Sequence, residues 1–241
     1  MTYAIRTENL VKQYKDKTAV DGLSLKVSEG ELVALLGVNG AGKTTTVKML
    51  TCLTKPSGGV AEVMGHDVLN DSEEVKRVVG VSPQDTSVAE NLTVKENLEF
   101  MADIYFSREK AKEAVKKTIS AFELGEYENK KAKLLSGGWK RKLSIAMAVI
   151  SEPKVLFLDE PTLGLDVLAR RQLWREIEKL KSDITIILTT HYMEEAEALA
   201  DRIVIMNDGK AMAIGTLEEL ENMTGKKGLE DVFVSIAESR V

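Results

Sequence analysis

The sequence predicts an α/β fold with an N-terminal antiparallel β subdomain, a core of parallel strands and an inserted α-helical subdomain. Three observations predict this arrangement. Residues 32–36 form a short, continuous apolar run, which is typical of a parallel strand buried on both faces. Residues 2–28 alternate apolar and polar side chains, which favours antiparallel strands. From residue 86 to residue 150 no clear strand pattern occurs, and apolar side chains recur at helical spacing.

Residues 37–44 match the phosphate-binding pattern G-x-x-x-x-G-K-T, directly after the apolar run. Glycines let the backbone wrap a phosphate, because no Cβ keeps the N–H groups away. Lys43 adds a cation for the β- and γ-phosphates, the Thr44 hydroxyl can ligate Mg²⁺, and the next helix directs its N-terminus at the phosphates. The alternative is a glycine-rich turn that binds nothing. The lysine, the threonine and the flanking patterns favour a P-loop core instead.

Composition limits the classes of function. The chain has 33 Lys and Arg against 38 Asp and Glu, a net charge of -5, which argues against nucleic acid as the main partner. The single cysteine, Cys52, excludes an intrachain disulfide, and we expect it to be buried in the helix after the phosphate loop. The longest apolar stretches, such as residues 143–150, are too short to span a bilayer, and the first residues lack the layout of a signal peptide. We therefore expect a protein of a reducing compartment that relies on another chain for any membrane function.

Polar side chains follow three of the predicted strands. Gln84 comes after one strand, Asp159 and Glu160 follow the apolar residues 155–158, and His191 follows a β-branched strand. Ligands bind at the carboxyl ends of strands in open α/β sheets. Beside a phosphate loop, Asp159 suits Mg²⁺ and Glu160 suits the activation of water. The alternatives are an ordinary loop amide, a solvated turn and a structural histidine.

A second Ser-Gly-Gly, at residues 136–138, precedes an apolar helix. Its free N–H groups and the helix dipole would make another anion site, although a plain helix cap fits the same residues. Tyr14 is expected in a polar loop, either as a half-exposed side chain or as an aromatic platform for a nucleobase.

Several helix starts and one hairpin complete the predicted elements. Capping residues precede helical patterns at four positions: Asp71, Thr93, Ser107 and Asp166. Glu74 and Glu96 would complete capping boxes with Asp71 and Thr93. Asp208 and Gly209 favour a hairpin turn between residues 202 and 214. After residue 215 only a short helix is predicted.

The motifs, taken in order, resemble those of the ATP-binding subunit of an ABC transporter. The matching segments are GVNGAGKTT, SPQD, LSGGWKRK, VLFLDEP, LGLD and TTHYMEEAE. The resemblance implies one ABC ATPase domain over residues 1–241. In it, residues 1–85 and 151–241 form the β subdomain and the P-loop core, and residues 86–150 form the helical lobe that carries the signature.

The resemblance implies an ATPase that uses ATP and Mg²⁺. For catalysis it implies Glu160 as the base, with His191 and Lys43 at the γ-phosphate. For ATP binding it implies Tyr14, Gly37, Asn39, Gly40, Ala41, Gly42, Lys43, Thr44, Thr45, Gln84, Ser136, Gly137 and Gly138. For the metal it implies Thr44, Gln84 and Asp159. Asp166 resembles the D-loop aspartate.

The resemblance also implies partners and a location. Two subunits, identical or homologous, would pack head to tail, so that the signature of one closes over the ATP of the other. A separate transmembrane permease subunit would hold them at the cytoplasmic face of the cell membrane. The segment from His191 to residue 216 and the LEDVF near the C-terminus look most like the drug-, lipid- or sodium-export type. The signature departs at one position, where Trp139 replaces the usual glutamine.

Other functions of ABC ATPases remain as alternatives. DNA-repair relatives carry long coiled coils or zinc sites, and ribosome-acting relatives usually carry two nucleotide domains. This sequence has neither cysteine pairs nor sustained heptads, and it has a single phosphate loop. An ATPase of a sensing or signalling complex is the second alternative, and co-purification with a multi-span membrane protein would distinguish it from a transporter subunit.

Overall fold

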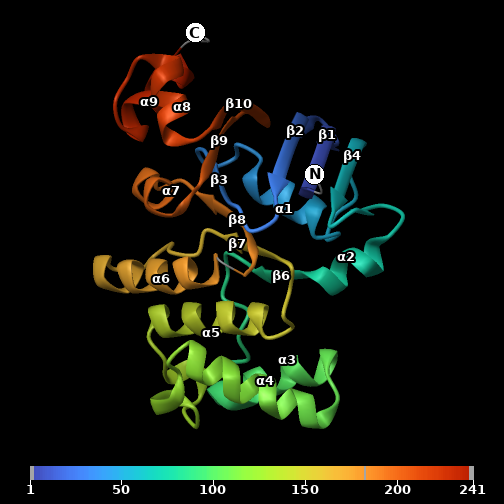
Figure 1. The fold of residues 1–241 in the computed structure, drawn as a ribbon, viewed down its shortest axis with the longest axis vertical. Helices are drawn as coiled ribbons and strands as arrows, with labels where there is room; N and C mark the ends of the chain where they lie inside the picture. The colour runs from blue at the N-terminus through green and yellow to red at the C-terminus, as the bar shows by residue number, and fades with distance from the viewer. Residues whose placement is uncertain (1–2, 182, 239–241) are drawn as a thin grey trace.

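The computed structural model describes residues 3–181 and 183–238, and its strands form two sheets (Figure 1). The antiparallel sheet has the spatial order β2 (Lys17–Ser28), β1 (Tyr3–Tyr14), β4 (Gly58–Val63), β5 (His66–Asp67). The second sheet has the order β10 (Lys210–Gly215), β9 (Arg202–Asn207), β3 (Leu32–Leu36), β8 (Thr185–Thr190), β7 (Val155–Asp159), β6 (Val79–Ser82). Its strands are parallel except β10, which pairs with β9 as the predicted hairpin. The predicted α/β fold class is confirmed.

The helices occupy distinct regions around these sheets. They are α1 (Lys43–Leu50), α2 (Ser72–Val78), α3 (Val94–Tyr105), α4 (Arg108–Ala121), α5 (Gly137–Val149), α6 (Val167–Leu180), α7 (Met193–Leu199), α8 (Leu217–Thr224) and α9 (Leu229–Glu238), with short 3₁₀ helices at Gly125–Tyr127 and Ala132–Leu134. Helices α3, α4 and α5 lie together at the bottom of Figure 1, and α8 and α9 lie at the opposite end. In the described part of the chain, no helix has the length and apolar character needed to cross a membrane.

Strand β3 lies between β8 and β9 and is fully buried. Leu32 packs into the core shared with the helices α3 to α6, whereas Val33 and Leu35 pack into the core beneath the antiparallel sheet. A strand covered on both faces needs apolar side chains at every position, which explains the continuous apolar run. The phosphate loop therefore starts from a strand that is buried on both faces.

The chain between β6 and β7 is helical in the described residues and has no strand there. Thr93 caps α3 as predicted: its hydroxyl accepts the N–H of Glu96 at 3.1 Å, and the Glu96 carboxylate accepts the N–H of Thr93 at 2.7 Å. Buried side chains such as Leu98 and Val115 hold α3 and α4 against α5 in one core. This unit presents the start of α5, which carries the second Ser-Gly-Gly.

Helix starts at Ser107 and Asp166 are also found where they were predicted. The Asp166 carboxylate accepts the N–H groups of Leu168 and Ala169, each at 2.9 Å, as an N-cap does. The predicted capping box at Asp71 is wrong. Its carboxylate accepts the N–H of Asp67 at 3.1 Å, so the side chain is used in the turn before α2.

Two further local predictions are corrected. Tyr14 is the last residue of β1 and pairs with Lys17, because the hairpin turn is tighter than the polar sequence suggested. Cys52 lies beyond the end of α1, with a left-handed φ of 59°, and its thiol is half-buried. The helix therefore ends one turn earlier than predicted.

The C-terminal segment, for which only one short helix was predicted, folds as α8 and α9. Leu229 and Val232 of α9 are buried, and the N–H of Leu229 donates to the carboxylate of Glu197 at 2.6 Å. Glu197 belongs to α7, so α9 packs against the helix that follows β8. The short amphipathic segment gains its stability from this contact, which the sequence pattern does not reveal.

Candidate active site

The loop between β3 and α1 requires glycine at its closest backbone approaches. Gly42 has a φ of 101°, and a Cβ there would lie 2.5 Å from the carbonyl oxygen of Ala19. A Cβ at Gly37 would collide with the carbonyl oxygen of Met206. Helix α1 begins at Lys43, so its N-terminal N–H groups face the loop. This is the local geometry that binds phosphate groups.

Lys43, Glu160 and His191 form a connected chain of charged and polar groups. Nζ of Lys43 lies 3.3 Å from Oε1 of Glu160 and donates to the carbonyl oxygen of Gly37 at 2.7 Å. Nδ1 of His191 lies 2.6 Å from Oε2 of Glu160. Lys43 and Glu160 are each only 5 % exposed. This buried carboxylate is held by its two nitrogen partners, Lys43 and His191.

The backbone of Glu160 is in an unusual conformation. Its φ of 51° is in the left-handed region, which is uncommon for a residue other than glycine. The N–H of Glu160 donates to the hydroxyl oxygen of Thr189 at 3.0 Å and lies 3.1 Å from the Thr189 carbonyl oxygen. The neighbouring strand β8 therefore fixes this conformation. Backbone strain of this kind concentrates at functional sites.

Asp159 accepts hydrogen bonds from hydroxyl groups on two elements. Its Oδ1 accepts the hydroxyl of Thr44 at 3.1 Å and the hydroxyl of Thr189 at 2.5 Å. This brings the start of α1 and the end of β7 together, as expected for two of the three predicted metal ligands. A carboxylate, a hydroxyl and the nearby amide of Gln84 are oxygen donors of the kind that Mg²⁺ takes, together with phosphate oxygens. In the described residues there is no group of three or more His, Cys, Asp and Glu that could hold a metal without a substrate.

A cavity of 430 Å³ lies over the loop and gathers most of the predicted ATP-binding residues. Its lining includes Tyr14, Asn39, Gly40, Ala41, Gly42, Lys43, Thr44, Thr45, Gln84, Glu160 and His191. Its size is within the range of small-molecule sites. Gly37 and Asp159 are outside the lining, because they lie behind Lys43 and Thr44. The Gly37 carbonyl oxygen accepts a hydrogen bond from Lys43, and the Asp159 carboxylate accepts one from Thr44.

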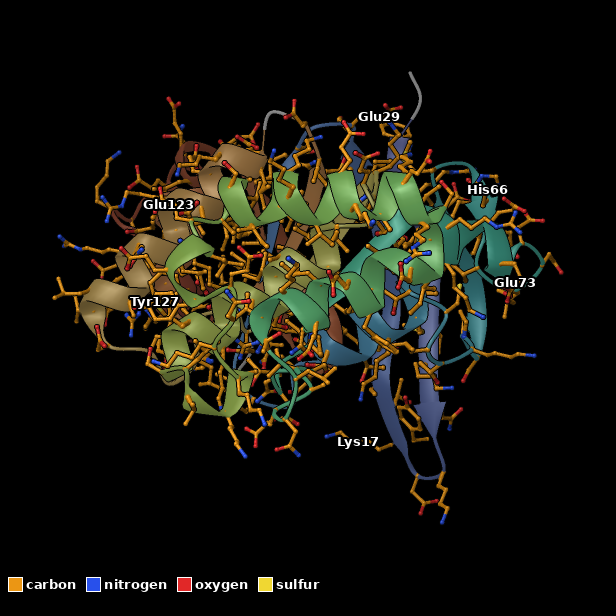
Figure 2. All side chains as sticks on the ribbon, turned by 90° about the horizontal axis from the view of Figure 1, so that it is seen from below. Lys17, Glu29, His66, Glu73, Glu123 and Tyr127 are labelled. Carbon is orange, nitrogen blue, oxygen red and sulfur yellow. The ribbon has the colours of Figure 1, made fainter. Side chains whose placement is uncertain are left out.

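Lys17, Ala19 and Leu163 also line the cavity and were not predicted. Lys17 lies near the tip of the β1–β2 hairpin, which projects from the rest of the molecule (Figure 2). Its Nζ lies 4.0 Å from the point where a side chain at Gly40 would place its Cβ. The sequence shows a lysine three residues after Tyr14, but only the fold of the hairpin over the loop places that cation beside the phosphate-binding backbone.

Glu195, on α7, is a fully buried carboxyl that sequence reasoning missed. It accepts the indole N–H of Trp174 at 3.0 Å. Burial raises the pKa of Glu195, and the charge of Glu160 acts in the same direction. The folded state therefore binds this proton more tightly than the unfolded chain does. Glu195 lies in the first turn of α7, and its hydrogen bond from Trp174 ties α7 to α6.

Residues 136–138 do not line the cavity in their own chain. Ser136 is the N-cap of α5, without a hydrogen bond from its side chain to the helix, and Gly137 and Gly138 form the first turn. Their N–H groups therefore lie at an open helix start. The structure does not bring this predicted half of the ATP site together with the phosphate loop within one subunit.

Trp139 packs beside this helix start. Its ring lies 4.3 Å from the ring of Tyr127, between centroids, and Nζ of Lys142 lies 5.0 Å from the Trp139 ring centroid. Lys142 is buried and lies 3.4 Å from the buried carboxylate of Glu176. Trp139 thus covers an ion pair behind the signature, with contacts that a glutamine would not make.

Comparison with known proteins identifies the family. The family profile described as ABC transporter matches residues 20–163. The daunorubicin/doxorubicin resistance ATP-binding protein DrrA of Streptomyces peucetius is 44% identical over 230 residues, which cover 95% of this chain and 70% of that protein. The human phospholipid-transporting ATPase ABCA3 is 45% identical over 203 residues, which cover 84% of this chain and 12% of that much longer protein.

A solved structure agrees with these relatives. The dimeric structure of a post-hydrolysis state of the ATP-binding cassette MJ0796, bound to ADP and Pi, matches with a TM-score of 0.79 and 26% identity. The match covers 88% of this chain and 98% of the other. The cavity over the loop, the charged chain around Glu160 and the separate helix start at Ser136 fit what such cassettes do, because they hydrolyse ATP as paired subunits that work with transmembrane permeases. This chain belongs to the ABC transporter family and is an ATP-binding and ATP-hydrolysing subunit.

Proposed function

We propose that the cavity over the phosphate loop binds Mg²⁺-ATP and that Glu160 is the base of its hydrolysis. The observation that carries this proposal is the chain from Lys43 through Glu160 to His191 at the edge of the cavity. Lys43 would exchange its contact with Glu160 for the γ-phosphate. Oε1 of Glu160 would then be free to accept a proton from the attacking water, while His191 keeps Oε2 in place. A positioned base of this kind typically contributes roughly a hundredfold to ten-thousandfold in rate.

The remaining predicted residues would take the roles that their positions support. Thr44, Asp159 and Gln84 would hold Mg²⁺, which neutralises charge on the phosphates during transfer. Tyr14, which is 44 % exposed at the mouth of the cavity, would stack on adenine. Lys17 would add a second cation at the phosphates.

The second half of the site would come from another subunit. Residues 136–138 lie away from the cavity of their own chain, at a helix start without a side-chain cap. We propose that they close over the ATP of a partner subunit, in a head-to-tail dimer. Residues 1–241 would then act as one ABC ATPase domain, with residues 86–150 as the lobe that carries the signature to the partner.

A surface groove supports the proposed permease contact. It has a volume of 460 Å³ and is lined mainly by apolar side chains, among them Leu53, Val81, Pro83, Met101 and Tyr105. Phe100 and Ile104, which are more than half exposed, extend the apolar surface along α3. We propose that a cytoplasmic segment of the permease binds here, which would hold this subunit at the cytoplasmic face of the membrane. Pro83 lines the groove, and the next residue, Gln84, lines the cavity.

The relatives favour an export substrate. DrrA is named for resistance to daunorubicin and doxorubicin, and ABCA3 for the transport of phospholipids. Both cargoes are amphipathic, so we propose that the permease partner of this chain exports a hydrophobic or amphipathic molecule. The alternative, a sensing complex, would be supported if the chain co-purified with a membrane protein that moves no cargo during ATP turnover.

The Lys43→Ala variant tests the assignment of the site. Removing the ammonium group from a desolvated phosphate site should abolish turnover and weaken ATP binding. Lys48→Ala is the matched control, because Lys48 lies exposed on the same helix, outside the cavity. ATPase rates and nucleotide affinity are measured for both. If Lys43→Ala hydrolyses ATP at the parent rate, the site assignment fails.

A further inference from the structure

The helix that begins at the signature lies along strand β6, which leads to Gln84. Three positions on one face of α5 lie, in order, against the strand and the residues that follow it. Arg141 reaches the residues just beyond the strand, and Oγ of Ser144 lies 3.0 Å from Oγ of Ser82. One turn further, a Cβ at Gly80 would collide with the carbonyl oxygen of Ala148. The helix and the strand are thus packed along their whole contact, with Arg141 at the end nearest the nucleotide cavity.

Arg141 is a buried cation without a carboxylate partner. It is 5 % exposed, and within the described residues no Asp or Glu oxygen lies within ion-pair distance of it. Its guanidinium donates through Nη1 to the carbonyl oxygen of Pro83 at 2.7 Å and through Nη2 to that of Gln84 at 2.5 Å. Burial lowers the pKa of Arg141, while the more distant charges of Asp85, Asp159 and Glu195 oppose this. Burying a charge away from water costs free energy. Here the buried guanidinium donates hydrogen bonds to the carbonyl groups of two consecutive residues in one loop.

We propose that Arg141 is a positioning residue that sets the place of Gln84 in the nucleotide cavity and links it to the signature at residues 136–138. This inference rests on the proposed role of Gln84 in Mg²⁺-ATP hydrolysis. The planar fork of the guanidinium fixes two neighbouring carbonyl groups at once, and so fixes the peptide from which the Gln84 side chain extends. Ser136 precedes Arg141 by about 7.5 Å along the same helix. A shift of the signature, when it meets the partner's nucleotide, would therefore reach Gln84 through this fork.

Lysine could not replace arginine in this role. Its ammonium group is a compact point charge on a flexible stem and cannot hold two carbonyl groups in one plane. Arg141→Lys keeps the positive charge and most of the apolar stem, so it isolates the fork geometry. Ser144→Ala is the matched control, because it loosens the next contact between the same helix and strand without touching Gln84.

A double-mutant cycle between Arg141→Lys and Gln84→Ala tests the proposal. The kcat, the KM for ATP and the Mg²⁺ concentration for half-maximal rate are measured for the parent chain, both single variants, the double variant and Ser144→Ala, each at a temperature well below its melting point. We expect Gln84→Ala to lower kcat by about tenfold and Arg141→Lys by about fivefold, with KM for ATP within about twofold of the parent. The double variant should be within about twofold of Gln84→Ala alone, because both changes remove the same function. Ser144→Ala should retain the parent kcat.

The possible outcomes separate this inference from the proposed function. If Gln84→Ala is impaired but Arg141→Lys has the parent kcat, or if the two effects multiply, Arg141 has only a structural role and the inference is overturned. If Ser144→Ala loses as much kcat as Arg141→Lys, the loss comes from general loosening of the helix, which also overturns it. If Gln84→Ala hydrolyses ATP like the parent, the proposed role of Gln84 fails and the inference fails with it.

Discussion

Trp139 is the residue at which this chain departs from the usual signature. The ring packs against Tyr127 in a tilted arrangement and lies over Lys142, so it already has contacts within its own subunit. Trp139→Gln should therefore lower the melting temperature but leave ATP hydrolysis within about threefold of the parent. Steady-state ATPase rates and thermal unfolding separate the two effects. A loss of rate of more than about tenfold, about 1.4 kcal/mol of barrier, would instead give the ring a role in catalysis or in closure of the dimer.

Glu195 gives the fold a pH dependence of predictable sign. Burial raises its pKa, so the folded state binds this proton more tightly than the unfolded chain does. The stabilisation is fully present below the unfolded carboxyl pKa and is lost as the pH rises through the raised, folded value. Glu195→Gln keeps the acceptor for Trp174 and cannot ionise. Its melting temperature relative to that of the parent should therefore rise as the pH increases above the ordinary carboxyl pKa. A difference that stays constant over this range would show that Glu195 is ionised throughout.

Elements that were predicted well are those whose signal is local. The apolar runs before Gly37 and Asp159 define the buried strands, and the capping box at Thr93 defines the start of α3. The polar residues at strand ends then meet at one edge of the sheet, because parallel strands end there together. Chain order and residue type suffice for these features, so the loop and the side chains at the strand ends could be predicted.

Features that were not predicted depend on contacts between distant segments. Lys17 enters the cavity because the β1–β2 hairpin folds over the phosphate loop, and α9 is stabilised by Glu197 of α7. The fork from Arg141 to Gln84 joins residues that are 57 positions apart. Asp71 shows the reverse case. The local sequence predicted a capping box there, but the Asp71 carboxylate accepts a hydrogen bond from the N–H of Asp67 instead.

The turn between β6 and α3 should meet the permease. The permease would cover the nearby groove, so a cysteine at Asn91, which is exposed, should cross-link to the co-expressed permease in a Cys52→Ser background. Lys210→Cys, in the β9–β10 hairpin, is the control for non-specific capture. Cross-linked products on gels, identified by mass spectrometry, are the readout. Products from position 210 alone would place the permease on the other end of the molecule and exclude this docking surface.

At the scale of the whole molecule, the chain carries two halves of an ATP site that it does not join. We propose that the phosphate loop with Asp159 and Glu160 is one half, and that the helix start at Ser136 is the other. A γ-phosphate held by N–H groups from two subunits would favour the closed dimer, because ATP would bind that state better than the open one. Hydrolysis would remove the shared phosphate, and the dimer would open. A permease would normally keep the two subunits near each other and raise their effective concentration.

The association state of the Glu160→Gln variant tests this central claim most directly. The glutamine keeps the shape of the side chain but cannot accept the proton, so the variant should bind ATP and remain closed. Light scattering at high protein concentration should show a dimer with Mg²⁺-ATP and a monomer with ADP, and the further change Ser136→Arg should abolish the dimer. A Glu160→Gln protein that stays monomeric at every concentration, or that dimerises equally well with ADP, would contradict the mechanism.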